Sequence, residues 1–465
     1  MVQVLNRYIA PKALLLVAIE GFLVVFSLMF AAKLRFWQDP EGFARYTEPS
    51  SFVLQALTVL ITLVMCFYYN DLYDLRGFRI LREQLLSVGQ ALGAGCILLA
   101  AIYFLIPGLL VSRGVLFIAI GTVFSAVSLT RAGLSRVWRL TGESKVLILG
   151  DGNLAVTVAQ EFSKRDDLDI RVVGLVAPGE TNSVEIFGHP IVGSASHLPE
   201  LVREHGISRI VVAIEDRRGA LPSRDLVRLR VQGIEVEEAD STLAALTGRI
   251  WLASVRPSWF VFSGGFKRST VTVVLKRAID LASGILGLAL SAPLMVLVAI
   301  AIRLDSKGPI FYRQIRVGLA DREFEILKFR SMCTEAEADS GPQWSQLADD
   351  RITRVGRFLR KYRLDELPQF INMIRGEMSL VGPRPERPVF VDQLREEILF
   401  YDERHSVRPG VTGWAQVEYK YGSSREDAYR KLEYDMFYLK NMSLFFDAAI
   451  LIRTVRIVLF GHGGR

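Results

Sequence analysis

The chain has 465 residues, of which 51% are hydrophobic, and a formal net charge of +7. This length allows two or three domains, the apolar excess points to a membrane protein, and a basic chain with apolar runs more often faces anionic lipid than nucleic acid. Only three cysteines occur and they lie far apart, so neither a disulfide framework nor a zinc site is indicated, and no aromatic-basic nucleic-acid module is visible.

Four long apolar runs fill the first part of the chain, at about 13–32, 52–69, 85–106 and 111–130. Each approaches the roughly 20 residues that a membrane-spanning helix needs. Basic residues flank the runs, namely Arg7, Lys12, Arg76, Arg79, Arg82, Arg131, Arg136 and Arg139, although the connection after the first run is also basic. We predict a four-span helical bundle over residues 1–140, with the N-terminus and the rest of the chain in the cytosol.

Residues 141–265 alternate short β-branched runs with helical stretches, which predicts a parallel, Rossmann-like α/β domain with strands at 145–149, 171–176, 209–214 and 234–237. The first strand runs into Gly150-Asp151-Gly152, and Ala155 completes a G-x-G-x-x-A turn of dinucleotide-binding type. Gly150 and Gly152 are therefore candidates for binding a nucleotide. The second predicted strand ends without the acidic residue expected at the ribose, which favours a structural or regulatory domain instead.

Residues 266–465 begin with an apolar segment at 281–302 that has Pro293 at its middle and basic residues at both ends. Proline breaks the helical hydrogen-bond ladder. We therefore predict a re-entrant helix that enters the bilayer, bends near Ser291-Ala292-Pro293 and leaves on the side it entered. A kinked fifth crossing is the alternative, and it would place the residues that follow on the opposite side.

A strand is predicted around Lys328 and Arg330, which are two residues apart and so project to the same face. Two cations on one strand face suit a diphosphate, and a solvated strand edge is the alternative. We include Arg316, from the preceding stretch, among the candidate phosphate ligands.

Two adjacent carboxylates, Asp365 and Glu366, follow basic residues that include Arg360 and Arg363. Helical spacing begins at Leu367 and stops at Gly376, so we predict that Asp365 is the N-cap of a helix. A helix N-terminus attracts phosphate, and a divalent cation held by the carboxylates would let a phosphorus atom approach an Asp365 oxygen as an electrophile. An ordinary cap beside a solvated glutamate is the alternative.

Two loops follow the carboxylates. Gly382-Pro383-Arg384-Pro385 holds Arg384 between two prolines, so little ordering entropy remains to be lost when it binds phosphate. A glycine-rich loop at 407–417 carries Arg408, Trp414 and Gln416, groups that suit a base and ribose, although Trp414 fits core packing equally well.

Residues 276–465 resemble the bacterial polyprenyl-phosphate sugar-1-phosphate transferases, the monotopic phosphoglycosyltransferases. The motifs that carry the resemblance are Lys276-Arg277 with Asp280, and the stretches 328–332, 364–369, 382–385 and 408–417. The four spans and the middle domain look like the long form of this family, and the C-terminal third looks like its exosortase-associated exopolysaccharide subgroup. Many relatives have Ser directly before the re-entrant proline, whereas this chain has Ser291-Ala292-Pro293.

The resemblance implies a two-step reaction that initiates exopolysaccharide synthesis. Asp365 attacks the β-phosphorus of a UDP-sugar and expels UMP, and a polyprenyl phosphate, typically undecaprenyl phosphate, then displaces Asp365. It further implies Mg²⁺ held by Asp365 and Glu366, phosphate binding by the residues Lys328, Arg330, Arg360 and Arg384, and a catalytic domain on the cytoplasmic face of the inner membrane. A homodimer is compatible with the amount of membrane-adjacent surface.

Two other functions remain open at this point. An NAD-dependent modifier of nucleotide sugars would use the Gly150 turn, but no Tyr-x-x-x-Lys pair follows it within that domain. A non-catalytic membrane scaffold or regulator of polysaccharide assembly would not need the two carboxylates, which are present.

Overall fold

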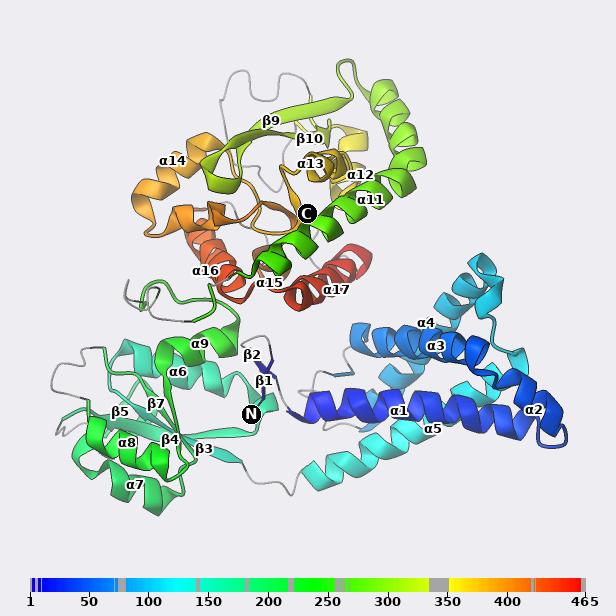
Figure 1. The fold of residues 1–465 in the computed structure, drawn as a ribbon. Helices are drawn as coiled ribbons and strands as arrows, with labels where there is room; N and C mark the ends of the chain where they lie inside the picture. The colour runs from blue at the N-terminus through cyan, green and yellow to red at the C-terminus, as the bar shows by residue number, and fades with distance from the viewer. Residues whose placement is uncertain are drawn as a thin grey trace. The chain divides into compact units, whose positions relative to one another are not determined.

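The computed structural model describes residues 2–4, 7–9, 11–70, 72–73, 81–138, 143–179, 184–215, 221–255, 260, 264–266, 268–333, 351–419, 422 and 424–460. The chain forms two compact units, Met1–Thr242 and Leu243–Arg465. Figure 1 shows the elements of each unit. The contacts thus divide the chain upstream of residue 266, where the sequence predicted the last domain to begin.

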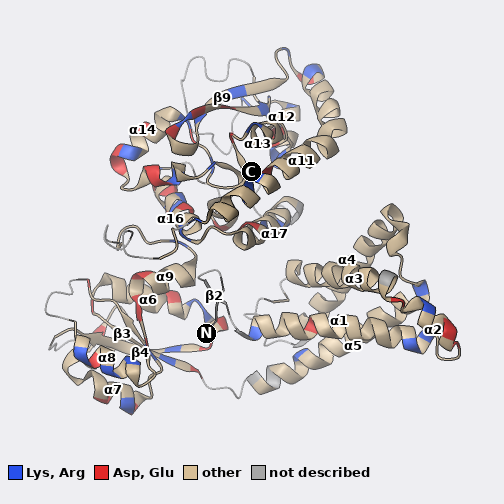
Figure 2. Ribbon diagram, viewed as in Figure 1, with Lys and Arg blue, Asp and Glu red and all other residues tan. Residues whose placement is uncertain are grey.

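Four long helices form a bundle in the first unit: α1 (Pro11–Arg35), α3 (Pro49–Tyr69), α4 (Leu81–Leu105) and α5 (Arg113–Trp138). They coincide with the four predicted apolar runs, and each is long and apolar enough to cross a membrane. Figure 2 shows long uncharged stretches along them. Shorter elements accompany the bundle, namely β1 (Val2–Val4), β2 (Arg7–Ile9), α2 (Pro40–Tyr46) and the 3-10 helix η2 (Pro107–Leu109).

The bundle core is a single cluster of buried side chains that draws on all four helices, such as Leu28, Leu63, Leu99 and Val123. One buried ion pair lies among these helices: Arg131 Nε donates to Glu20 Oε1 at 2.6 Å. We predicted Arg131 as a basic residue flanking the fourth apolar run. In the structure it is buried, and its ion pair with Glu20 makes this burial possible. Of the other predicted flanking residues, Arg76, Arg79 and Arg139 lie outside the described residues.

The α/β part of the first unit is a six-stranded sheet of order β5-β6-β4-β3-β7-β8, parallel except for β5. The strands are β3 (Ser144–Leu149), β4 (Ile170–Ala177), β5 (Glu185–Ile186), β6 (His189–Ser194), β7 (Arg209–Val212) and β8 (Glu235–Glu238). The four predicted strands are confirmed to within a few residues. The prediction missed β5 and β6.

Helices cover both faces of this sheet (Figure 1). The buried cluster on one face joins strand residues such as Leu147 and Ile210 to Leu198 of α7 (Leu198–His205) and Leu229 of α8 (Ser223–Val231). The remaining helices are α6 (Asn153–Ser163) and α9 (Ala239–Thr247), with short 3-10 helices η3 (Asp166–Leu168) and η4 (Ala195–His197).

The second unit opens with α11 (Thr270–Asp305), a 36-residue helix that contains Pro293. It is the fifth helix, among the described residues, that is apolar and long enough to cross a membrane. Pro293 cannot donate a backbone hydrogen bond, and Ser291 Oγ donates to Gly287 O at 2.6 Å, a back-bond that favours bending. Figure 1 shows α11 changing direction along its length.

The rest of the second unit packs around α11 and two small sheets. β9 (Phe311–Val317) pairs antiparallel with β10 (Glu323–Phe329), and β11 (Ser379–Val381) pairs parallel with β12 (Gly410–Thr412). The helices are α12 (Arg354–Lys361), α13 (Gln369–Arg375), α14 (Pro388–Glu397), α15 (Trp414–Glu418), α16 (Arg425–Asn441) and α17 (Leu444–Phe460), with 3-10 helices η5 (Leu319–Asp321), η6 (Leu364–Glu366) and η7 (Tyr401–Ser406).

The segment before α11 also belongs to this unit. Trp414 Nε1 donates to the Gly248 carbonyl at 2.6 Å, and Arg249 pairs with the buried Glu433 at 2.9 Å. Trp414 is 2% exposed and packs against Phe437 and Phe446. Of the two readings that the sequence left open for Trp414, the structure shows core packing.

Candidate active site

Asp365 and Glu366 lie on the 3-10 turn η6, between α12 and α13. Arg363, directly before this turn, has a positive φ of 54°, a conformation that costs a non-glycine residue of order 1–3 kcal/mol and is often found at functional sites. The predicted helix, α13, begins only at Gln369, with Pro368 as its N-cap, and ends at Gly376 with φ 85°. Asp365 is therefore not the helix cap that the sequence predicted. It lies in a 3-10 turn, whose hydrogen bonds join residues three apart, and α13 begins after this turn.

Three cations surround Glu366. Arg384 Nη2 donates to Glu366 Oε1 at 2.8 Å, Lys328 Nζ lies 3.4 Å from the same oxygen, and Arg363 Nη1 lies 3.8 Å from Oε2. Burial raises the pKa of Glu366, but the charges of Arg384, Lys328 and Arg363 outweigh burial and hold that pKa well below its usual range. Glu366 is thus an ionised carboxylate that fixes these cationic side chains.

Asp365 has a different environment although it is the adjacent residue. It is 8% exposed and accepts no hydrogen bond from any described residue. Burial, followed by the negative charge of Glu366, raises the pKa of Asp365, while Lys328, Arg360 and Arg384 oppose that rise. One carboxylate of the pair is therefore occupied by cations, and the other keeps its oxygens available.

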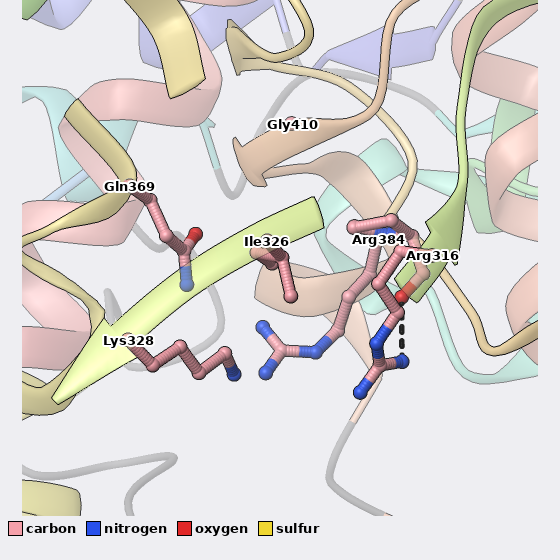
Figure 3. Close-up of a pocket in the computed structure, with 7 residues that line it drawn as sticks. Arg316, Ile326, Lys328, Gln369, Arg384 and Gly410 are labelled. Atoms are coloured by element: carbon pink, nitrogen blue, oxygen red, sulfur yellow. Dashed lines mark hydrogen bonds between the residues drawn. The ribbon is translucent and has the colours of Figure 1, made fainter. Parts of the chain in front are cut away.

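A pocket is lined by Lys328 and Arg384, two of the cations that contact Glu366. Its lining residues are Arg316, Ile326, Lys328, Gln369, Arg384, Pro385 and Gly410, and it encloses about 220 Å³, part of which is open to solvent. Figure 3 shows the ends of Lys328 and Arg384 pointing toward one another, with Arg316 beside Arg384. Three of the predicted phosphate ligands thus meet in one place, and a pocket with this charge suits an anionic ligand.

Arg316 is held by groups on two elements. Its Nη1 donates to the Pro385 carbonyl at 2.9 Å, the dashed line in Figure 3, and its Nη2 donates to Gln314 Oε1 at 2.7 Å. Glu386 lies 3.3 Å from the same guanidinium. These contacts leave Arg316 at the pocket wall with a defined orientation.

The backbone that carries Arg384 is itself anchored by Arg404, a residue that the sequence analysis missed. Arg404 Nη2 donates to the Arg384 carbonyl at 2.9 Å, and Arg404 Nη1 donates to the Tyr401 hydroxyl at 2.6 Å. Arg404 also pairs with Asp435 at 2.9 Å. The sequence gives little sign of this role. Arg404 lies in a stretch without apolar periodicity, and its partners Arg384 and Asp435 are 20 and 31 residues away along the chain.

Four other predicted ligands have protein partners elsewhere. Arg330 donates to the Ser306 and Lys307 carbonyls at 2.8 Å each, at the end of α11, because β10 ends one residue before it. Arg360 Nε donates to Ser331 Oγ at 3.0 Å. In the loop at 407–417, Arg408 donates to the Gly376 carbonyl at 2.9 Å and Gln416 donates to the Val411 carbonyl at 3.1 Å.

The predicted nucleotide turn lies at the end of β3, where Gly150 has φ 147° and an added Cβ would meet the Ala213 carbonyl oxygen at 2.5 Å. The N-terminus of α6, which would receive a phosphate, instead has a carboxylate beside it. Leu154 N donates to Glu215 Oε1 at 3.3 Å. A negative charge at this position disfavours a pyrophosphate.

A second group of possible metal ligands lies apart from the pocket. Asp321, Asp402 and His405 bring their ligand atoms within 4.8 Å of one another. Arg395 pairs with both carboxylates, at 3.0 Å and 2.7 Å. Since this guanidinium already pairs with both of them, we assign no ion there.

Two family models match the chain. Residues 271–461 match the family described as bacterial sugar transferase, and residues 69–236 match the family described as CoA-binding domain. The first match covers all the elements that form the pocket and α11 except its first residue. The second covers α4, α5 and the α/β sheet except the last two residues of β8.

Several curated relatives are similar to the chain. A UDP-glucose:undecaprenyl-phosphate glucose-1-phosphate transferase of Escherichia coli (strain K12) is 41% identical, covering 68% of each chain. The enzyme of the same name from Xanthomonas campestris pv. campestris is 29% identical, covering 98% of this chain and 96% of the relative.

A third relative, a UDP-N-acetylgalactosamine-undecaprenyl-phosphate N-acetylgalactosaminephosphotransferase of Aeromonas hydrophila, is 43% identical over 52% of this chain. The aligned part spans only 56% of that relative's length. Identity of 41% over 68% of each chain, together with the family match, establishes the relationship. The chain therefore belongs to the bacterial sugar transferases, the family of polyprenyl-phosphate sugar-1-phosphate transferases.

Proposed function

We propose that the protein transfers sugar 1-phosphate from a UDP-sugar to undecaprenyl phosphate and so initiates exopolysaccharide synthesis. The observation that carries the mechanism is the buried Asp365 carboxylate, which has no hydrogen-bond partner among the described residues. It is adjacent to Glu366, whose partners Lys328 and Arg384 line a pocket. An unencumbered carboxylate beside phosphate-binding groups can act as a nucleophile.

The pocket suits the diphosphate of the donor. Its lining brings together three cationic side chains, Arg316, Lys328 and Arg384, which suit the charged diphosphate rather than the whole UDP-sugar. Guanidinium groups bind phosphate oxygens through paired N–H donors, and burial strengthens these contacts. The relatives named above use UDP-glucose or UDP-N-acetylgalactosamine by name, so both donors belong in the test below.

The chemistry consists of two displacements at phosphorus. In the first, an Asp365 oxygen forms a bond to the β-phosphorus, the bond from that phosphorus to the bridging oxygen breaks, and UMP leaves with the electron pair. In the second, a phosphate oxygen of undecaprenyl phosphate attacks the same phosphorus and Asp365 leaves as a carboxylate. Neither step needs a net proton transfer, so positioning and charge neutralisation are the main requirements.

Mg²⁺ fits the oxygen donors of this site, and Asp365 together with Glu366 would hold it. Asp365 has the freer oxygens, since three cations already contact Glu366. When bound, Mg²⁺ would neutralise charge on the transferred phosphoryl group. The protein's own side chains account for the rest: Glu366 orients Arg384 and Lys328, and these two bind phosphate oxygens.

A lipid acceptor requires the active site to lie at the membrane surface. We propose that α11 is the predicted re-entrant helix, entering and leaving on the cytoplasmic side, so that the pocket meets both the water-soluble donor and the lipid phosphate. Basic residues at both ends of the apolar segment and a proline at its middle favour this arrangement over a crossing. A homodimer in the inner membrane remains part of the proposal.

The experiment is a UMP-release assay on the purified full-length protein in lipid, with Mg²⁺, undecaprenyl phosphate and a panel of UDP-sugars. We expect UMP with at least one donor, and a sugar-phosphate adduct on Asp365 when the lipid acceptor is omitted. Asp365→Asn should remove both the adduct and turnover while the variant remains folded. UMP release by Asp365→Asn at the wild-type rate would rule out this nucleophile.

A further inference from the structure

Gln369 is a pocket residue to which neither the sequence motifs nor the mechanism above gives a role. It is the first residue of α13, four positions after Asp365, and its side chain is 3% exposed. It lines the same pocket as Lys328 and Arg384. Figure 3 shows its amide reaching toward β10, beside Lys328 and Ile326.

The Gln369 amide makes no hydrogen bond within the described parts of the chain. Asn372, on the same helix, is the informative contrast: its Oδ1 accepts from Leu327 N at 3.0 Å, and its Nδ2 donates to the Glu325 carbonyl at 2.8 Å and to Glu377 at 2.6 Å. Buried side-chain amides are normally satisfied in this way. The Gln369 amide therefore faces the pocket without a partner among the described residues.

The chemistry of the pocket indicates what would satisfy this amide. The charged side chains that line it, Arg316, Lys328 and Arg384, are all donors. A ligand that pairs with them must carry several acceptor oxygens, so the Gln369 amide would meet acceptors as well. The Gln369 NH₂ group then has a ligand oxygen as its partner. A ligand hydroxyl group is less suitable here, because the three cations also need acceptor oxygens.

We propose that Gln369 is a catalytic residue that donates an amide N–H to a non-bridging oxygen of the phosphoryl group attacked by Asp365. This inference rests on the proposed function and adds a neutral donor to it. Charge on the equatorial oxygens changes as the phosphorus passes between its two partners, and a fixed donor aimed at one of them stabilises the transition state. Gln369 itself gains and loses no atoms in either displacement.

The test compares Gln369→Leu and Gln369→Glu with wild type in the UMP-release assay. Leucine removes the donor at similar volume, and we expect kcat to fall about 10²-fold with a smaller change in KM. Glutamate keeps the shape but places a carboxylate against phosphate, so we expect kcat to fall further in Gln369→Glu than in Gln369→Leu. Gln393→Leu, the same substitution at an exposed position of α14, should leave kcat unchanged.

Thermal unfolding separates this role from a structural one. The Gln369 amide loses no hydrogen bond to a described residue when leucine replaces it, so Gln369→Leu should be slow but as stable as wild type. A Gln369→Leu variant with the wild-type kcat would overturn the inference. So would a Gln369→Leu variant whose Tm falls far enough for unfolding at the assay temperature to account for the lost activity. Because wild type is measured in the same assay, an inactive wild type would refute the proposed function instead.

Discussion

Asp435 is a buried carboxyl that supports the pocket indirectly, through Arg404. It is 1% exposed and pairs with Arg404, which in turn holds the Arg384 carbonyl. Burial raises the pKa of Asp435 to about 6, although Arg404 and Lys431 lower it and Glu386 adds to the rise. The carboxyl is therefore harder to ionise in the folded protein than in the unfolded chain.

This difference predicts a pH dependence of stability. The pKa of an aspartate in an unfolded chain is about 3.9, so between pH 4 and pH 6 the folded state binds more protons at Asp435 than the unfolded state does. The contribution of Asp435 to the free energy of unfolding should thus be largest below pH 4 and should fall by about 2–3 kcal/mol as the pH rises through 6. Denaturant unfolding of the detergent-purified protein measures this profile.

Asp435→Asn is the matched variant, because it keeps the shape and cannot ionise. The difference in unfolding free energy between wild type and Asp435→Asn should change with pH only between about 4 and 6. A difference that stays constant over this range would show that Asp435 ionises at its ordinary pKa and that Arg404 fully compensates burial.

At the scale of elements, the first half of α11 is tied to β11 by polar contacts. Asp280 Oδ1 accepts from Leu380 N and from Ser379 Oγ, both at 2.9 Å, and Lys276 Nζ donates to the Val381 carbonyl at 2.9 Å. β11 runs directly into the loop that carries Arg384. The long apolar helix therefore determines where one side of the pocket lies.

Asp280→Ala should weaken this tie and lower the unfolding free energy by about 1–2 kcal/mol, because it leaves the partly buried Leu380 N–H without its acceptor and leaves the buried Ser379 hydroxyl only the Val381 carbonyl. Asp280→Asn keeps a side-chain oxygen at the same position and should recover part of the loss. Thermal unfolding of the two variants measures the difference. Equal Tm values for the alanine and asparagine variants would mean that these hydrogen bonds contribute nothing to the docking of β11.

At the scale of the whole molecule, the topology of α11 decides on which side of the membrane the second unit lies. A re-entrant helix puts the residues after α11 on the same side as those before it, and a crossing puts them on opposite sides. We expect Gln393→Cys, in a chain whose Cys66, Cys96 and Cys333 have been replaced, to react with a membrane-impermeant maleimide only from the cytoplasmic side.

Pro293→Ala supplies the missing N–H and favours a straight helix, so it should increase labelling of that cysteine from the opposite side and reduce UMP release in parallel. Labelling of the Pro293-containing chain from outside the cell would contradict the re-entrant arrangement and the proposed meeting of the two substrates.

The sequence alone was sufficient for features that depend on local periodicity and composition. The four apolar helices, the strands β3, β4, β7 and β8, the long helix with Pro293 and the glycine that ends α13 were all predicted, because each depends on the spacing of neighbouring side chains. The same holds for the association of Asp365 with Glu366 and for the two prolines around Arg384, which are adjacent in the chain.

The tertiary structure alone decided which polar groups meet. Lys328 and Arg330 are two residues apart, yet one contacts Glu366 and the other the end of α11, because β10 ends between them. Arg404 joins the site through contacts that no local pattern records. Gln369 lies in the 364–369 motif, but only the fold places it in the pocket. A side chain's chemistry follows from its sequence position, but its partners, its burial and hence its role depend on segments brought together only when the chain folds.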